Sequence, residues 1–83
     1  MPYLTKTQAL RKKIPRNSIQ TILIPRGWGL EKSRDWLYDH RYYYGNHRST
    51  SHFYRFMQEN PIIGSSYYTK VLSNGVELVF QKF

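Results

Sequence analysis

The sequence predicts one small α+β domain, with the order β-α-β-β-β and one helix packed on a mostly antiparallel sheet. Three observations lead to this: a run of β-branched residues, a single helical pattern after it, and an Asn-Gly pair between two strand-like runs at the end. The chain has 83 residues, of which 40% are hydrophobic and 17% aromatic. That composition suffices for one domain and excludes a wholly disordered protein.

The first strand is predicted over Ser18–Ile24, where Ile and Thr dominate and Pro25 follows as a stop. The two glycines of Arg26–Gly29 then predict a turn. This turn lacks the third glycine of a dinucleotide-binding loop and the Lys-Ser/Thr of a phosphate-binding loop. We therefore interpret it as a tight turn rather than a phosphate site.

A helix is predicted from Leu30 to Arg41, a stretch without Pro or Gly. Four side chains fall near one helical face, as expected for a helix that packs on a sheet: Leu30, Trp36, Leu37 and His40. Three acids stand four residues apart on another stripe, beside basic residues, which is typical of a solvated helix face: Glu31, Asp35 and Asp39.

The remaining segments predict a turn, a strand, a loop and a hairpin. Gly45–Ser51 is polar, His52–Gln58 is aromatic-rich and strand-like, and Glu59–Ser66 contains a Pro and a Gly. Tyr67–Ser73 and Val76–Phe83 flank Asn-Gly, which favours a two-residue type I′ turn because both positions need a positive φ.

That turn would place Val71 opposite Leu78 and Thr69 opposite Phe80. One face of the hairpin would then be apolar and meet the helix: Tyr67, Thr69, Val71, Leu78 and Phe80. One helix cannot cover all the aromatic residues of so small a chain. We therefore expect a second copy of the chain to cover another part of the sheet, as a homodimer.

The net charge of +8 is concentrated near the N-terminus: residues 1–30 hold six basic residues and no acid, against seven basic and five acidic residues in 31–83. We predict a basic arm over residues 1–17, disordered or weakly helical alone, followed by the folded domain over 18–83. The arm would neutralise phosphates, contact an acidic protein, serve as a nuclear address, or remain a solvated tail.

Basic side chains recur beyond the arm, in part between aromatic rings, as in surfaces that bind nucleic acid. The candidate nucleic-acid-binding residues are Lys6, Arg11, Lys12, Lys13, Arg16, Arg26, Arg41, Arg48 and Arg55. Tyr42, Tyr43 and Tyr44 are candidates for base stacking or a dimer contact, and at least one must be exposed if the segment is extended. Packing in the core or in a dimer is the alternative use of these rings.

Several classes of site have no support in the sequence. The chain has no Cys, which excludes disulfides, thiolate metal sites and a Cys nucleophile. The three His residues lack zinc-ligand spacing, and no catalytic constellation is present. We expect no metal, no cofactor and no enzymatic activity. No apolar run reaches the length of a membrane span, and no secretory signal pattern is present.

Four segments together resemble a known group of proteins: IQTILIP, EKSRDWLYDH, FYRFMQ and YYTKVLSNGVELVF. They are similar to segments of small uncharacterised basic proteins encoded by large DNA viruses of amoebae and, more distantly, by phages. The resemblance covers residues 18–83 and consists of packing patterns. It implies a viral accessory or virion-packaged protein and assigns no active-site residue.

The leading hypothesis is a non-enzymatic, basic viral protein that binds nucleic acid without sequence preference. It would act inside the cell, in the host nucleus or in the virion. The rival hypothesis is a homodimeric protein-interaction adaptor that uses its basic arm for nuclear targeting or for contact with an acidic host or viral protein.

Overall fold

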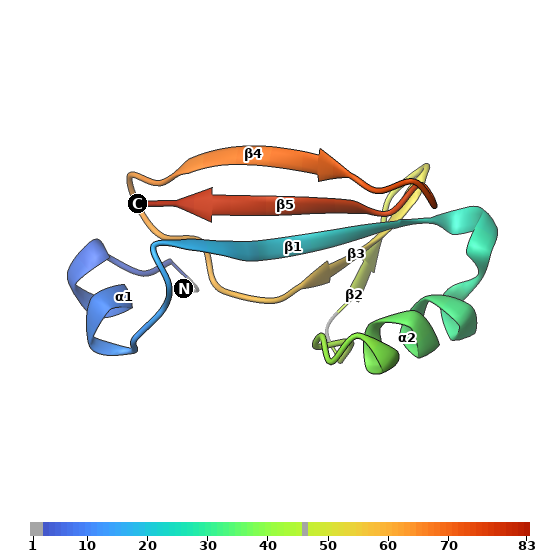
Figure 1. Ribbon diagram of the computed structural model, residues 1–83, viewed down its shortest axis with the longest axis horizontal. Coiled ribbons are helices and arrows are strands. Elements are labelled where there is room, and N and C mark those ends of the chain that lie inside the picture. The colour runs from blue at the N-terminus through green and yellow to red at the C-terminus, as the bar shows by residue number, and fades with distance from the viewer. Residues whose placement is uncertain (1–2, 46) are drawn as a thin grey trace.

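The computed structural model describes residues 3–45 and 47–83 as a five-stranded antiparallel sheet flanked by two α-helices (Figure 1). In chain order the elements are α1 (Lys6–Arg11), β1 (Asn17–Pro25), the 3-10 helix η1 (Arg26–Trp28), α2 (Leu30–Asp39), β2 (His47–Ser49), β3 (Phe53–Met57), β4 (Ser66–Val71) and β5 (Glu77–Lys82). The strands lie in the order β2-β3-β1-β5-β4. The predicted α+β class with one main helix is confirmed.

Strand β1 is the centre of the sheet, as its β-branched composition favours. It pairs antiparallel with β3 on one edge and with β5 on the other. Ile22 lies opposite both Phe56 and Leu78, so these side chains share one face of the sheet. That face carries the main core, which is formed by Ile22, Ile24, Leu37, Phe56, Val76 and Leu78.

Helix α2 covers this face at one end of the sheet. Its Leu37 is buried in the main core, and the Ser33 hydroxyl donates to the Gly29 carbonyl oxygen at 2.8 Å. The predicted helix over 30–41 is two residues too long. Arg41 has a φ of 62°, which stops the right-handed helix after Asp39.

The opposite face is closed at the other end of the sheet by a buried amide. Gln81 alternates with the core-facing residues of β5 and therefore points away from α2. Its side chain accepts from the backbone N–H of Ile62 and donates to the carbonyl of Asn60, both at 3.1 Å. This pair of bonds ties the loop between β3 and β4 to the sheet.

The N-terminal basic segment, predicted to be disordered or weakly helical alone, forms α1 in the full chain and packs on that loop. Thr5 and Gln8 form a reciprocal capping box at the start of α1. A second, smaller core joins the segment to the rest of the chain: Leu4, Ala9, Ile14 and Ile62, with Phe83 packed against them. Burial of these apolar side chains offsets the entropy lost when the segment is ordered.

The C-terminal hairpin forms around Asn74-Gly75, but the predicted register is wrong by one residue. Val71 lies opposite Glu77 rather than Leu78, because Gly75 has a φ of 91° while Asn74 keeps a negative φ. The Leu72 N–H donates to Val76 at 2.8 Å, which leaves a three-residue loop with a glycine bulge instead of a type I′ turn. A slip of one residue turns β4 over, so Tyr68, not Tyr67, shares the α2 side of the sheet.

The prediction of a turn over Gly45–Ser51 misses a strand that lies within this segment. Asn46, also in this segment, lies outside the described residues. The short strand β2 begins at His47 and pairs with β3, with Arg48 opposite Arg55. Three polar residues have no periodicity from which a strand can be predicted.

Replacing Gln81 with Ala tests the buried amide. The variant leaves the buried Ile62 N–H and the partly buried Asn60 carbonyl without their partner, so we expect a loss of about 2–3 kcal/mol in the free energy of unfolding, measured with urea. Replacing the exposed neighbour Lys82 with Ala should change it by less than about 0.5 kcal/mol. Equal losses in the two variants would contradict this role for Gln81.

Candidate nucleic-acid interface

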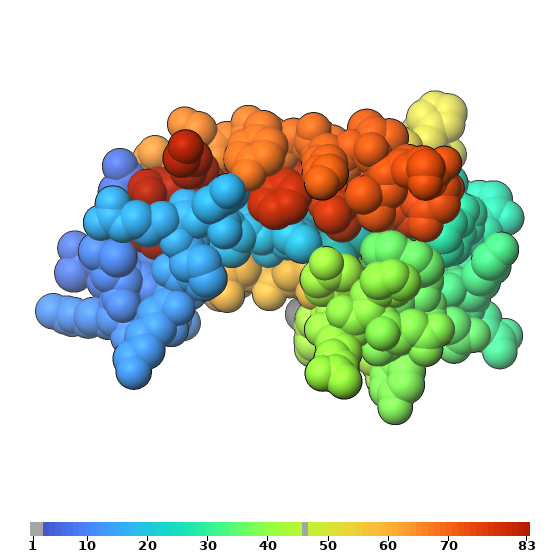
Figure 2. All heavy atoms as spheres, in the orientation of Figure 1, coloured from blue at the N-terminus to red at the C-terminus, as the bar shows by residue number. Residues whose placement is uncertain are grey.

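Five of the predicted cations lie together in the N-terminal segment, and all five are exposed: Lys6, Arg11, Lys12, Lys13 and Arg16. Helix α1 and helix α2 occupy opposite ends of the molecule (Figure 1). In the space-filling view these ends form two projections with a notch between them (Figure 2). The segment itself contains no acidic residue.

Both α-helices end with a cation in the left-handed region, where glycine is usual. Lys13 follows α1 with a φ of 60°, and Arg41 follows α2 with a φ of 62°. In each case the two bonds of a Schellman motif are present: the N–H groups of Lys13 and Ile14 donate to Leu10 and Ala9, and those of Arg41 and Tyr42 donate to Tyr38 and Leu37. A side chain at such a position strains the backbone, and the favourable interaction of a cation with the helix dipole offsets part of that cost.

The second group is a pair of arginines on the face of the sheet that α2 leaves open. Arg48 and Arg55 lie directly opposite each other on β2 and β3, and both side chains are exposed. Their sequence neighbours His47 and Phe56 point to the other side, toward α2, where their ring centroids lie 5.9 Å apart. By alternation along the strands, the two arginines therefore point to the open face. Like charges directly opposite on neighbouring strands are destabilising, so sheet stability does not explain this pair.

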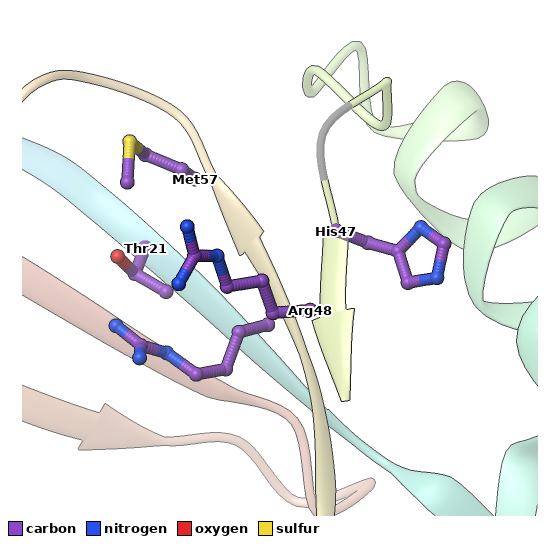
Figure 3. Close-up of a pocket in the computed structure, with 5 residues that line it drawn as sticks. Thr21, His47, Arg48 and Met57 are labelled. Atoms are coloured by element: carbon purple, nitrogen blue, oxygen red, sulfur yellow. The ribbon is translucent and has the colours of Figure 1, made fainter. Parts of the chain in front are cut away.

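The two arginines line a shallow hollow of about 270 Å³ together with Thr21, His47 and Met57. Arg48 reaches across β3 toward Thr21 and Met57, whereas His47 points to the other side, toward α2 (Figure 3). Thr21 is buried and forms the floor. A lining with two guanidiniums and no carboxylate suits an anion.

One acid on the same face of the sheet, Glu77, is separated from this pair by an apolar residue. Leu23 lies opposite Arg55 on one side and opposite Glu77 on the other. Two strand spacings separate the backbones of Arg55 and Glu77, roughly 10 Å. Both arginine side chains are exposed and no carboxylate lines the hollow, so an external anion can reach it.

Two of the predicted cations have other surroundings. The Arg26 guanidinium donates to the Thr50 carbonyl at 3.1 Å and lies 5.7 Å from the centre of the Tyr54 ring, so it supports the turn between β2 and β3. Arg41 is exposed at the end of α2, beside Asp39 in the sequence. Neither lines the hollow.

The three consecutive tyrosines divide between packing and exposure. Tyr42 packs against the main core and stacks near Trp36, with ring centroids 6.0 Å apart. Tyr43 and Tyr44 are exposed, which confirms that the segment cannot turn all three rings inward. The Gln58 side chain fixes the backbone of Tyr43 through bonds of 2.7 Å to its N–H and 2.6 Å to its carbonyl.

The predicted cations thus form an N-terminal group and a sheet-face pair, with Arg26 and Arg41 apart from both. Sequence reasoning missed Thr21 and Met57 as the floor of the hollow. Alternation along strands would have found them, but only once β2 and its register were known.

No family model, no curated protein and no solved structure matches the chain. A function must therefore be inferred from its own residues. Within residues 3–45 and 47–83, no cluster of three His, Asp or Glu side chains is placed to hold a metal ion. No helix in the same part of the chain is long and apolar enough to cross a membrane.

Replacing Lys13 with Gly tests the strained helix end. We expect the free energy of unfolding to rise by about 1 kcal/mol, because glycine adopts the left-handed region without steric conflict. Lys12→Gly is the matched control: it removes the same charge from a residue with a φ of −80°. That variant should lose up to about 1 kcal/mol. A gain in both variants would attribute the effect to charge instead of strain.

Replacing Arg48 with Thr tests the repulsion across β2 and β3. We expect the variant to be more stable by about 0.2–1 kcal/mol at low salt. The part of the gain that comes from charge should vanish near 1 M salt, where the screening length falls to about 3 Å. Arg48→Lys keeps the charge and should show no such salt-dependent gain; if it does, repulsion is not the cause.

Proposed function

We propose that this protein is non-enzymatic and binds nucleic acid without sequence preference, as a viral accessory or virion-packaged protein would. The observation that carries this proposal is the pair formed by Arg48 and Arg55 on an open sheet face, in a hollow without a carboxylate. The five cations of the N-terminal segment would add phosphate contacts.

The pair has the chemistry that a phosphate needs. An arginine presents a planar fork of N–H donors, which matches two phosphate oxygens. Side chains directly opposite on antiparallel strands have Cβ atoms about 4.5–5.5 Å apart, so both guanidiniums would reach one phosphate or two consecutive ones. A bound phosphate would also relieve the repulsion between them.

The absence of sequence preference follows from the kind of contact. Contacts to phosphate fix the position of a strand but do not identify its bases. The floor of the hollow, Thr21 and Met57, offers no amide that would recognise a base edge by paired hydrogen bonds. The exposed rings of Tyr43 and Tyr44 would stack on any unpaired base.

A homodimeric adaptor is the second candidate, and one observation favours it. Every residue of the edge strand β4 is exposed, so the sheet has a free edge for another protein chain. In this role the N-terminal cations would contact an acidic protein or serve as a nuclear address.

Fluorescence anisotropy with short DNA and RNA strands, measured over a range of salt, tests nucleic-acid binding. We expect affinity to fall linearly on a log-log plot, because each neutralised phosphate releases counterions. The double variant Arg48→Gln/Arg55→Gln should flatten that slope by about 1.4–1.8, which corresponds to two lost phosphate contacts at about 0.7–0.9 each.

The matched control is Lys32→Gln/Arg34→Gln, which removes the same charge from exposed positions on α2 beside Glu31 and Asp35. It should leave the slope nearly unchanged. Failure of the natural protein to bind any DNA or RNA at about 50 mM salt would refute the proposal, since non-specific binding is strongest at low salt.

A further inference from the structure

The two edges of the sheet differ in how they are protected against another strand. Edge strand β2 has three residues, two of which are His47 and Arg48. Edge strand β4 has six residues, all exposed, and carries one charge, Lys70. Short and charged edges resist pairing, whereas a longer edge rich in Tyr, Thr and Val is open to it.

The backbone of β4 presents its free hydrogen-bonding groups at alternate residues. The Leu72 N–H donates across the hairpin to Val76 at 2.8 Å, which fixes the phase of the ladder with β5. By alternation, Lys70 and Tyr68 also bond inward to β5. The N–H and C=O groups of Tyr67, Thr69 and Val71 therefore point outward.

We propose that a second copy of this chain pairs antiparallel with β4, with Thr69 on the two-fold axis. Thr69 would exchange hydrogen bonds with Thr69 of the second copy, and Tyr67 would exchange them with Val71 of the second copy. All three outward-facing residues of each β4 are then paired. This register is also centred on the strand, so no outward group within β4 is left without a partner.

The side chains favour the same register. On the open face, Tyr67 would meet Val71 of the second copy, an aromatic ring against a β-branched residue. On the α2 side, Tyr68 would meet Lys70 of the second copy, where the ammonium can lie over the ring. A shift by two residues in one direction would place Lys70 opposite itself. A shift in the other direction would leave Val71 beyond the partner strand.

The surface to be covered is apolar and already ordered. Tyr67, Tyr68 and Val71 are 49%, 45% and 64% exposed. The Tyr68 ring stacks on Phe80 at 5.0 Å, and its hydroxyl donates to Asn17 at 2.7 Å. A strand that is fixed before association loses little conformational entropy when it pairs, and its self-complementary sequence identifies the partner as a second copy.

The dimer would also place both arginine pairs on one surface. The two-fold axis of an antiparallel strand pair is perpendicular to the sheet, so the open faces of both copies lie on the same side. Counting strands at about 4.8 Å each puts the two pairs roughly 35–45 Å apart before twist. This consequence rests on the proposed function; the dimer does not.

Sedimentation equilibrium up to about 100 µM tests the dimer. Thr69→Pro removes an outward N–H without touching the ladder to β5, so the variant should sediment as a monomer. Thr69→Val keeps the N–H and the β-branched shape and should remain a dimer. A natural protein that stays monomeric, or a Thr69→Pro variant that still dimerises, would overturn the proposal.

Hydrogen exchange of the natural protein gives a second measurement that needs no variant. The amides of Tyr67, Thr69 and Val71 should exchange more slowly as concentration rises, while those of Tyr68 and Lys70 stay protected throughout. Free exchange at the first three in a dimeric sample would exclude β4 as the interface. Anisotropy on the same samples separates the two proposals: Arg48→Gln/Arg55→Gln should lose nucleic-acid affinity and remain dimeric.

Discussion

Two short helices cannot cover both faces of a five-stranded sheet, and the rest of the architecture follows from this limit. Helix α2 covers one face at one end, over the core around Ile22 and Leu37. The N-terminal segment and the loop bonded to Gln81 cover the opposite face at the other end. Each face is therefore left open over part of its area. The open regions hold side chains that the core does not need, and those side chains are available for binding.

Most of the main sheet was accessible to sequence reasoning because its signals are local. The β-branched run of β1, the helical period of α2 and the aromatic run of β3 each suffice to identify their element. The Asn-Gly pair also marks the hairpin correctly. The Asn-Gly pair does not by itself predict the register of the two strands. Asn74 keeps a negative φ, and its side-chain oxygen accepts from the Val76 N–H at 3.1 Å. One residue of slip then reverses the outward face of β4.

The candidate site was less accessible because it depends on elements that have no periodic pattern. Strand β2 is recognisable only through its pairing with β3, and this pairing is what brings Arg48 next to Arg55. The Thr5–Gln8 capping box at the start of helix α1 can be recognised in the sequence. The position of the helix depends on contacts with Ile62, which is far away in the sequence. Charge and spacing in the sequence indicated nine candidate basic side chains but could not distinguish among them. The strand pairing is needed to distinguish Arg26, which supports a turn, from Arg48 and Arg55, which lie opposite each other and face solvent.

Cations recur at positions where a neutral residue would give a more stable fold. Lys13 and Arg41 hold left-handed backbone that glycine would adopt freely, and Arg48 and Arg55 repel each other across two strands. Each position alone costs the fold no more than about 1–2 kcal/mol. The helix dipole favours a cation at the C-terminal ends of α1 and α2, but it does not account for the pairing of Arg48 with Arg55. The proposed polyanionic partner would convert the repulsion between these two arginines into attraction.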